Sequence, residues 1–410
     1  MSQPPTPPPI DPRATRDVVV VAFACFLLIG WTGLLVPSLI RQVQGTFAQS
    51  DAGIGLAYLL GSLLYVSGTI ASGALARRLP RALLLGAGPA LITAGLLVEA
   101  AAPAWAVFLL GFLVVNLGAG LVDAGVNALG MDLFPGRASM LNRIHLFFAV
   151  GAFASPLAVG GLVGAGVAWP LILVGTALVA APLALATATR ALPPAHPPVP
   201  QAPVPTAADE PVERGTAGRL PLPLVMLAIA IACYVASEIG VSNWLVRFLD
   251  DAPLEVATLA LSMFWLFIGL GRLVSSFIAD RLGLVRFATT FAAASGAAIL
   301  AAIVVPSLPL VVILFAVAGF AAGPVYPTIM AIGGALYPGR ATAVSSVLSS
   351  AAILGSVVYP PLMGVVSETA GIWWSMLGAA LFAFACAAAI AAGSRVARRV
   401  PEPAPAPRAA

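Results

Sequence analysis

Residues 133–139 read Leu-Phe-Pro-Gly-Arg-Ala-Ser, and residues 336–342 read Leu-Tyr-Pro-Gly-Arg-Ala-Thr. The two stretches lie 203 residues apart. The same offset places residues 279–282 (Ala-Asp-Arg-Leu) on residues 76–79 (Ala-Arg-Arg-Leu). An apolar bias aligns hydrophobic segments by chance, but it does not align a loop motif in the same gap-free register. The pattern therefore predicts that the chain is an internal duplication.

The segments around these loops are long and apolar. A transmembrane helix needs about 20 mostly apolar residues, and twelve windows of the chain meet this requirement. They are residues 18–40, 52–75, 80–101, 104–130, 138–164 and 168–190 in the first repeat, and 221–248, 256–279, 284–305, 308–335, 341–366 and 371–395 in the second. We predict an all-α membrane protein whose twelve helices form two pseudo-symmetric six-helix bundles.

The composition agrees with a chain whose solvent is mostly lipid. Of the 410 residues, 60% are hydrophobic and 9% are charged, and the mean hydropathy is +1.02. Soluble domains contain roughly 25% charged residues. These values exclude a soluble enzyme, a disordered chain and a secreted disulfide scaffold.

The distribution of basic and sulfur-containing residues excludes further classes. The net charge is +4, but all 20 basic residues are arginines scattered between apolar segments, so we expect no nucleic-acid partner. Cys25, Cys233 and Cys386 are far apart and match no metal or disulfide pattern. The chain lacks a nucleotide-binding Gly-Lys loop and a nucleophile elbow. We expect no enzyme activity, no cofactor and no metal, and a monomer whose partners are a small-molecule substrate, protons and membrane lipid.

The two bundles are joined by a segment of different composition. Residues 191–220 are rich in Pro and carry charges, which is typical of an extended linker. The predicted domains are therefore a bundle over 17–190, the linker, and a bundle over 221–395. We expect the Pro-rich ends, 1–16 and 396–410, to be disordered.

Arginine placement predicts the orientation. With the N-terminus in the cytoplasm, twelve crossings place 17 arginines in cytoplasmic segments and only Arg41 and Arg247 in outer loops, while Arg272 lies within a helix. Cytoplasmic loops carry the excess of Arg and Lys in membrane proteins. We expect a multi-pass protein of the cell (inner or cytoplasmic) membrane with both termini and the linker in the cytoplasm.

With these features, the chain resembles the major facilitator superfamily. That family carries a Gly-x-x-x-Asp-Arg-x-Gly-x-x-Arg loop after its second and eighth helices. Residues 276–286 match the pattern except at its first Gly, and the copy that begins at Gly73 has Arg77 in place of the Asp. The resemblance implies a transporter whose loops latch the two halves on the cytoplasmic side. The candidate latch residues are Arg78, Arg137, Arg272, Asp280, Arg281 and Arg340; ordinary positive-inside anchoring explains the arginines but not Asp280.

Within the superfamily, residues 118–127, 141–148 and 323–329 resemble the fucose permease and related sugar–proton symporters. The resemblance implies that Asp123 takes part in proton coupling, with Asn127 one turn later. That permease also uses an acid in its first helix.

Here the first span has no acid between Asp17 and Asp51, so the same pair of acids is not reproduced and fucose is not implied. Gly151, Pro156 and the pair 160–161 resemble a degenerate form of the Gly-Pro motif of drug–proton antiporters.

Polar residues inside the first bundle are candidates for function because an ionised side chain at mid-membrane costs about 2.5–3.5 kcal/mol. Asn116, Gly120, Asp123 and Asn127 fall on one helical stripe, which predicts a wet face. The alternative for Asp123 is a helix–helix contact with Arg143 or His145.

Three further residues of this half have two interpretations each. His145 relays a proton or fixes a helix through one hydrogen bond. Asn142 binds substrate or begins a helix, and Trp31 walls the site or packs.

The second bundle offers Glu238 as a further proton or substrate carboxylate, or as a partner of Arg247. Tyr234 lies one turn before it and Asn243 follows it, and both are predicted to bind substrate. Tyr326 is the equivalent of Asp123 in the repeat, so we expect the two to face each other across a cavity. Its alternative role is an interhelical hydrogen bond.

These observations favour a proton-coupled secondary transporter that imports a small polar solute, such as a sugar, by alternating access. An exporter that exchanges protons for an apolar or cationic compound is the main alternative. A polytopic receptor that binds without moving solute is a third hypothesis.

Overall fold

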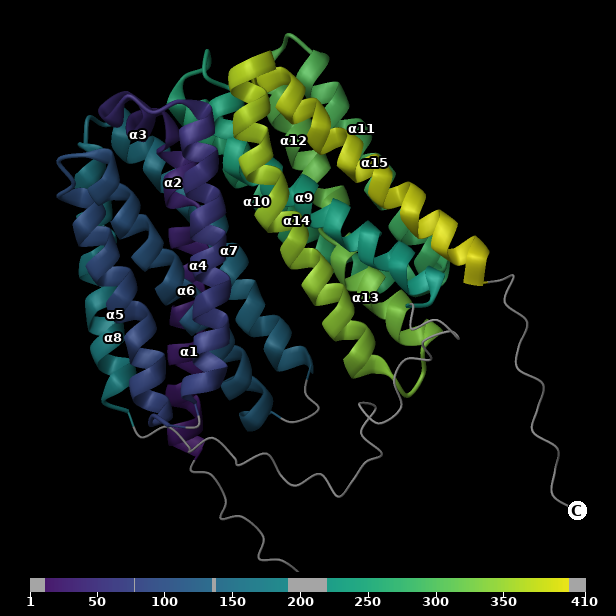
Figure 1. Cartoon of the computed structure of the whole chain (residues 1–410), viewed down its shortest axis with the longest axis horizontal. Coiled ribbons are helices and arrows are strands. Elements are labelled where there is room, and N and C mark those ends of the chain that lie inside the picture. Colours follow the sequence, from purple (N-terminus) through teal and green to yellow (C-terminus); the bar gives the residue numbers. More distant parts are fainter. Residues whose placement is uncertain (1–11, 77, 135–137, 191–219, 398–410) are drawn as a thin grey trace, which may run out of the picture. The chain divides into compact units, whose positions relative to one another are not determined.

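The computed structural model describes residues 12–76, 78–134, 138–190 and 220–397, without the side chains of residues 12–16, 138–142, 276–280, 341–342 and 397. These residues form fifteen helices and the turns and loops that connect them (Figure 1). They are α1 (Pro12–Gly33), α2 (Leu35–Ser38), α3 (Ile40–Phe47), α4 (Asp51–Leu75), α5 (Arg81–Ala100), α6 (Trp105–Leu133), α7 (Ala138–Gly164), α8 (Trp169–Ala188), α9 (Leu222–Phe248), α10 (Leu254–Leu282), α11 (Leu284–Val304), α12 (Leu308–Ala322), α13 (Val325–Leu336), α14 (Ala341–Ala370) and α15 (Ile372–Ala397).

The prediction of twelve spans is confirmed. Twelve helical segments of the described chain are long and apolar enough to cross a membrane, and α1 with α2, and α12 with α13, each form one of them. Their bounds differ from the predicted windows by a few residues, because apolar composition marks a span more sharply than it marks a helix end.

The described chain divides into two compact units. Unit 1 comprises residues 12–49 and 57–190, and unit 2 comprises residues 50–56 and 220–397. The first two turns of α4 group with unit 2 because they contact its helices: Asp51 accepts hydrogen bonds from Arg247 and Ser367. The backbone of Gly55 lies against that of Pro361.

In unit 1, α5 packs between α6 and α8, and α1 packs against α7. The α5–α6 hairpin is held close by glycine. A Cβ atom added at Gly95 would lie 2.6 Å from the carbonyl oxygen of Gly111, and one added at Gly118 would lie 2.6 Å from that of Gly88. Small residues let membrane helices approach closely, where dispersion forces and weak Cα–H contacts stabilise the pair.

In unit 2, α9 packs against α14 and α15, while α12 packs against α10 and α11. Their apolar side chains form a continuous core that includes Leu224, Ile231, Ile329 and Leu348, all fully buried. Tyr234 belongs to this core, and Tyr326 packs against it.

The duplication is visible in the helix crossings. In each unit the second spanning helix meets the fourth where a glycine lies against a backbone carbonyl, and the contacts recur at the offset of 203 residues. They are Gly68 with Leu117 and Gly120 with Tyr65 in unit 1, and Gly271 with Phe320 and Gly323 with Ile268 in unit 2.

The fourth span of unit 2 is broken between α12 and α13 at Gly323 and Pro324. Pro324 explains part of this break. Proline has no N–H to donate, so a carbonyl four residues earlier loses its helical partner. Pro327 has the same effect on the carbonyl of Gly323, which is then available to another donor.

Candidate functional site

Asp123 on α6 lies at the centre of a polar cluster in unit 1. The amide of Asn127 donates a hydrogen bond to its Oδ1 at 3.0 Å. Tyr65 on α4 lies close enough to the same carboxylate to interact with it electrostatically. His145 on α7 is close enough to interact with it electrostatically. Three predicted residues, Asp123, Asn127 and His145, are thus brought together.

Tyr65 is a member of this cluster that sequence reasoning missed. A single Tyr in an apolar helix gives no sequence signal of function. It reaches Asp123 because Gly120, one turn earlier on α6, lets the two helices approach: a Cβ at Gly120 would lie 2.0 Å from the Tyr65 carbonyl oxygen. The ring of Phe26 contacts that of His145 edge-on at 5.0 Å and restricts its orientation.

The stripe of Asn116, Gly120, Asp123 and Asn127 therefore runs along the α4–α6 contact. Gly120 is buried in it, and the Nδ2 atom of Asn116 would lie 3.1 Å from a Cβ at Gly61. Asn116 itself donates to the carbonyl of Phe112 at 2.8 Å. Its amide lies at a helix contact, whereas Asp123 is half-buried at the junction of three helices.

Glu238 and Arg272 form an ion pair in unit 2. The Nη2 atom of Arg272 on α10 lies 3.4 Å from Oε1 of Glu238 on α9, whose side chain is 8% exposed. We expected Arg272 in the loop latch, but its guanidinium instead points to Glu238. Arg247 pairs with Asp51 and Asp250, each at 2.9 Å, so the alternative pairing of Glu238 with Arg247 does not form.

The position of Arg272 depends on a helix defect. Its Nε–H donates to the carbonyl oxygen of Gly323 at 3.2 Å. In an unbroken helix that oxygen would accept from the residue four positions later, which is Pro327 and has no N–H. The guanidinium replaces the missing donor, so Arg272 is held between a carboxylate and a backbone carbonyl.

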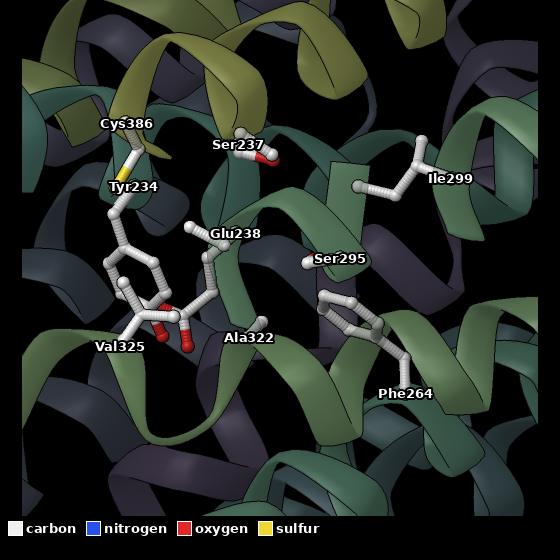
Figure 2. Close-up of a pocket in the computed structure, with 11 residues that line it drawn as sticks. Tyr234, Ser237, Glu238, Phe264, Ser295, Ile299, Ala322, Val325 and Cys386 are labelled. Carbon is white, nitrogen blue, oxygen red and sulfur yellow. The ribbon is translucent and has the colours of Figure 1, made fainter. Parts of the chain in front are cut away.

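Two tyrosines border this ion pair. The rings of Tyr234 and Tyr326 lie 6.2 Å apart at 56°. Figure 2 shows the Tyr234 hydroxyl beside the Glu238 carboxylate, with Ala322 at the end of α12 and Val325 at the start of α13 close by. The hydroxyl is buried, and within the described residues it has no hydrogen-bond partner. A small cavity that Glu238, Ser237 and Ser295 help to line adjoins the pair and has room for about one water molecule.

The clusters of the two units occupy equivalent places in the repeat. At the offset of 203 residues, Asp123 corresponds to Tyr326, and Arg272 corresponds to Thr69, whose hydroxyl contacts Gly120 at 3.4 Å. Unit 1 thus places a carboxylic acid, Asp123, at the crossing of its second and fourth spans, and unit 2 places a cationic residue, Arg272, at its own crossing. Duplication supplied the geometry, and substitution made the two sites chemically different.

Other predicted residues lie elsewhere or are not described. The indole of Trp31 donates to Thr176 on α8 at 3.1 Å, so one edge of the ring is used in packing. Asn243 is half-buried one turn beyond Glu238. The remaining latch candidates are Arg78 and Arg281, which are exposed, and Arg340, which is half-buried. Arg137 and the side chains of Asn142 and Asp280 lie outside the described residues.

Across residues 12–397, in the parts that are described, no group of three or more His, Cys, Asp or Glu side chains is arranged to hold a metal ion.

The chain matches a family model over nearly its whole length. The model, described as Major Facilitator Superfamily, matches residues 18–252 and 225–410. A mouse protein, sodium-dependent glucose transporter 1A, is 26% identical over 136 residues, which are 33% of this chain and 32% of the mouse protein. The match spans about a third of that relative's length.

Solved structures share the fold at low identity. A bacterial homologue of the human lysosomal transporter Spinster, inward-facing and unoccupied, has a TM-score of 0.79 at 17% identity, covering 94% of this chain and 98% of that one. The nucleoside transporter NupG has a TM-score of 0.70 at 16% identity, over 93% and 99%. A D-xylose–proton symporter has a TM-score of 0.70 at 14% identity, over 94% and 98%. At these identities the likeness is one of fold.

Proposed function

Because the chain belongs to the Major Facilitator Superfamily and is a membrane transporter rather than an enzyme, we propose that it couples protons to the movement of a small polar solute. The solute class that the site supports best is a sugar or a similar polyol. Alternating access of the two repeats around the solute is the mechanism that this architecture serves.

Asp123 is the proposed proton carrier. Its side chain is half-buried next to Tyr65, and its carboxylate accepts a hydrogen bond from the amide of Asn127. A carrier must be able to adopt both the neutral and the ionised form. His145 lies next to it and is exposed, so it is the proposed route by which a proton reaches or leaves the carboxylate.

The Glu238–Arg272 pair, with Tyr234 and Tyr326, is the proposed solute site of unit 2. A guanidinium donates several hydrogen bonds and a carboxylate accepts several, so the pair matches the hydroxyl groups of a polyol. Tyrosine rings provide a surface for the apolar face of a sugar. Since Arg272 already neutralises Glu238, the second proton-carrier role that the sequence suggested for Glu238 becomes secondary in this proposal.

The remaining site assignments stay predictions. Asn116, Asn142, Asn243 and Trp31 are proposed to contribute to solute binding, and Tyr326 to face Asp123 during the cycle. The cell membrane as location, the cytoplasmic termini and the monomeric state are likewise proposals; labelling of single cysteines placed in residues 191–220 tests the orientation.

The names of the similar proteins support a polar solute. One is a D-xylose–proton symporter and one is a nucleoside transporter. The mouse relative is named as sodium-dependent, so sodium is the coupling ion that must be compared with the proton.

The experiment uses the full chain in proteoliposomes. D-glucose, D-xylose and uridine are first screened for binding by thermal shift, and uptake of the best ligand is then measured with an imposed pH gradient or sodium gradient. Asp123→Asn is expected to abolish uptake driven by the pH gradient while retaining solute counterflow. Asp132→Asn, an acid on the same helix that pairs with Arg81, is the control and should transport normally.

Two results would reject the proposal. Full gradient-driven uptake by Asp123→Asn would show that Asp123 is not the proton carrier. Uptake driven by a sodium gradient alone would show that sodium, and not the proton, is the coupling ion. Proton-driven efflux of an organic cation without sugar transport would favour the exporter hypothesis instead.

A further inference from the structure

Glu99 lies in the last turn of α5 and has no part in either cluster. It is 1% exposed. Both carboxylate oxygens are buried and have no hydrogen-bond partner in the described part of the chain. Buried carboxylates are paired in nearly all proteins, because an isolated ionised group in an apolar interior is very costly.

Among the described residues, no cation pairs with this carboxyl group. The helices packed on α5 are α6 and α8. The described α8 has no titratable side chain, and the acids of α6, Asp123 and Asp132, lie in its second half. The other charged residue of α5 is Arg81, at its opposite end.

The helix itself also disfavours a negative charge at this place. Glu99 is the penultimate residue of α5, and its own carbonyl accepts a bond from Ala102 at 3.3 Å. The last carbonyls of a helix carry a partial negative charge that repels an anion. Three independent features therefore favour the neutral acid: burial, the absence of a cation and the helix terminus.

The Glu99 side chain is tightly packed, and aromatic rings gather at the same end of the α5–α6 hairpin. A Cβ at Gly111 on α6 would lie 2.8 Å from Cγ of Glu99, so the side chain is held against the α6 backbone. Phe108, one turn before Gly111, is fully buried. Its ring lies 5.3, 5.7 and 6.1 Å from those of Phe47, Trp105 and Trp169. We call these four rings the aromatic cap.

The site is separate from Asp123. The side chain of Leu85 on α5 lies against Gly125 of α6, which places Asp123 near the level of Leu85. Glu99 is 14 positions further along α5, which corresponds to about 21 Å at 1.5 Å per residue.

We propose that Glu99 is a proton-binding site of its own: a carboxylic acid that holds its proton while the aromatic cap is closed and releases it when water enters this end of the α5–α6 hairpin. The ligand is the proton, because one carboxylate with no other oxygen ligands is a poor site for a metal cation. The proposal does not depend on which solute is transported.

Infrared spectroscopy of the full chain in nanodiscs tests the proposal. The difference spectrum of wild type minus Glu99→Gln at neutral pH should contain the carbonyl band of a protonated carboxylic acid. The matched control is Glu255→Gln, which changes an exposed acid at the start of α10 and should remove a carboxylate band. A carboxylate band lost in Glu99→Gln would overturn the proposal.

Stability gives a second, independent measurement. The acid is neutral in the folded chain and ionises in the unfolded chain above about pH 4.3, so folding takes up a proton. Wild-type stability should therefore fall as pH rises above this value, relative to Glu99→Gln, whose carboxamide does not titrate. Glu99→Gln should fold, since a carboxamide has the shape and neutrality of the acid. The proposal would be contradicted if Glu99→Gln failed to fold, or if wild type and Glu99→Gln had the same pH dependence of stability. Stabilisation of the wild type by sodium chloride alone would also contradict it.

Discussion

In the Glu238–Arg272 pair, removing the arginine should destabilise the fold more than removing the glutamate. Arg272→Gln leaves the Glu238 side chain, 8% exposed, without its cation. Breaking a buried ion pair in this way costs about 3–5 kcal/mol, and we expect the lower end, about 3 kcal/mol, because the N–O distance of 3.4 Å is long for such a pair.

Glu238→Gln leaves a different residue behind. The Arg272 side chain is 39% exposed and keeps its bond to Gly323, so a carbonyl oxygen still stabilises its charge. We expect a loss of about 1 kcal/mol, the value of one hydrogen bond. The double variant should also lose about 1 kcal/mol, which gives a coupling energy of about 3 kcal/mol.

The assay is denaturant unfolding of the four proteins in mixed micelles, followed by tryptophan fluorescence. The control cycle uses Asp17→Asn and Arg190→Gln, a pair separated by 3.3 Å whose side chains are 67% and 37% exposed. Exposed pairs contribute at most about 1 kcal/mol. Equal losses for the two single variants of the buried pair, or a coupling no larger than that of the control pair, would refute the interpretation.

Two further substitutions test the helix crossings. Gly120→Ala should destabilise unit 1 by at least about 2 kcal/mol, because its Cβ would lie 2.0 Å from a backbone oxygen of α4; Gly73→Ala, with open space around it, should be neutral or slightly stabilising. Pro327→Ala restores an N–H donor to the Gly323 carbonyl and should release Arg272, so thermal stability should be kept while solute affinity falls several-fold in a binding titration. Unchanged affinity would show that the proline does not position the guanidinium.

The amino-acid sequence alone was sufficient to predict the twelve spans and the duplication, and it singled out Asp123 as a candidate for proton coupling. These properties are local or periodic. A span requires only an apolar stretch of sufficient length, and a repeat requires only a constant offset. Asn127 follows Asp123 by one helical turn, and side chains at this spacing are neighbours on a helix. Their hydrogen bond could therefore also be predicted from helix geometry.

Only the tertiary structure joined Tyr65 to Asp123 and directed Arg272 to Glu238 instead of to the loop after α10. Glycine crossings bring residues that are distant in the chain into contact, and their partners follow from how two helix surfaces fit. A long arginine side chain extends in several directions, and the free carbonyl of Gly323 selects one of them. The isolation of Glu99 was likewise invisible in the sequence, because a missing partner is a property of every helix packed around a residue and not of the residue itself.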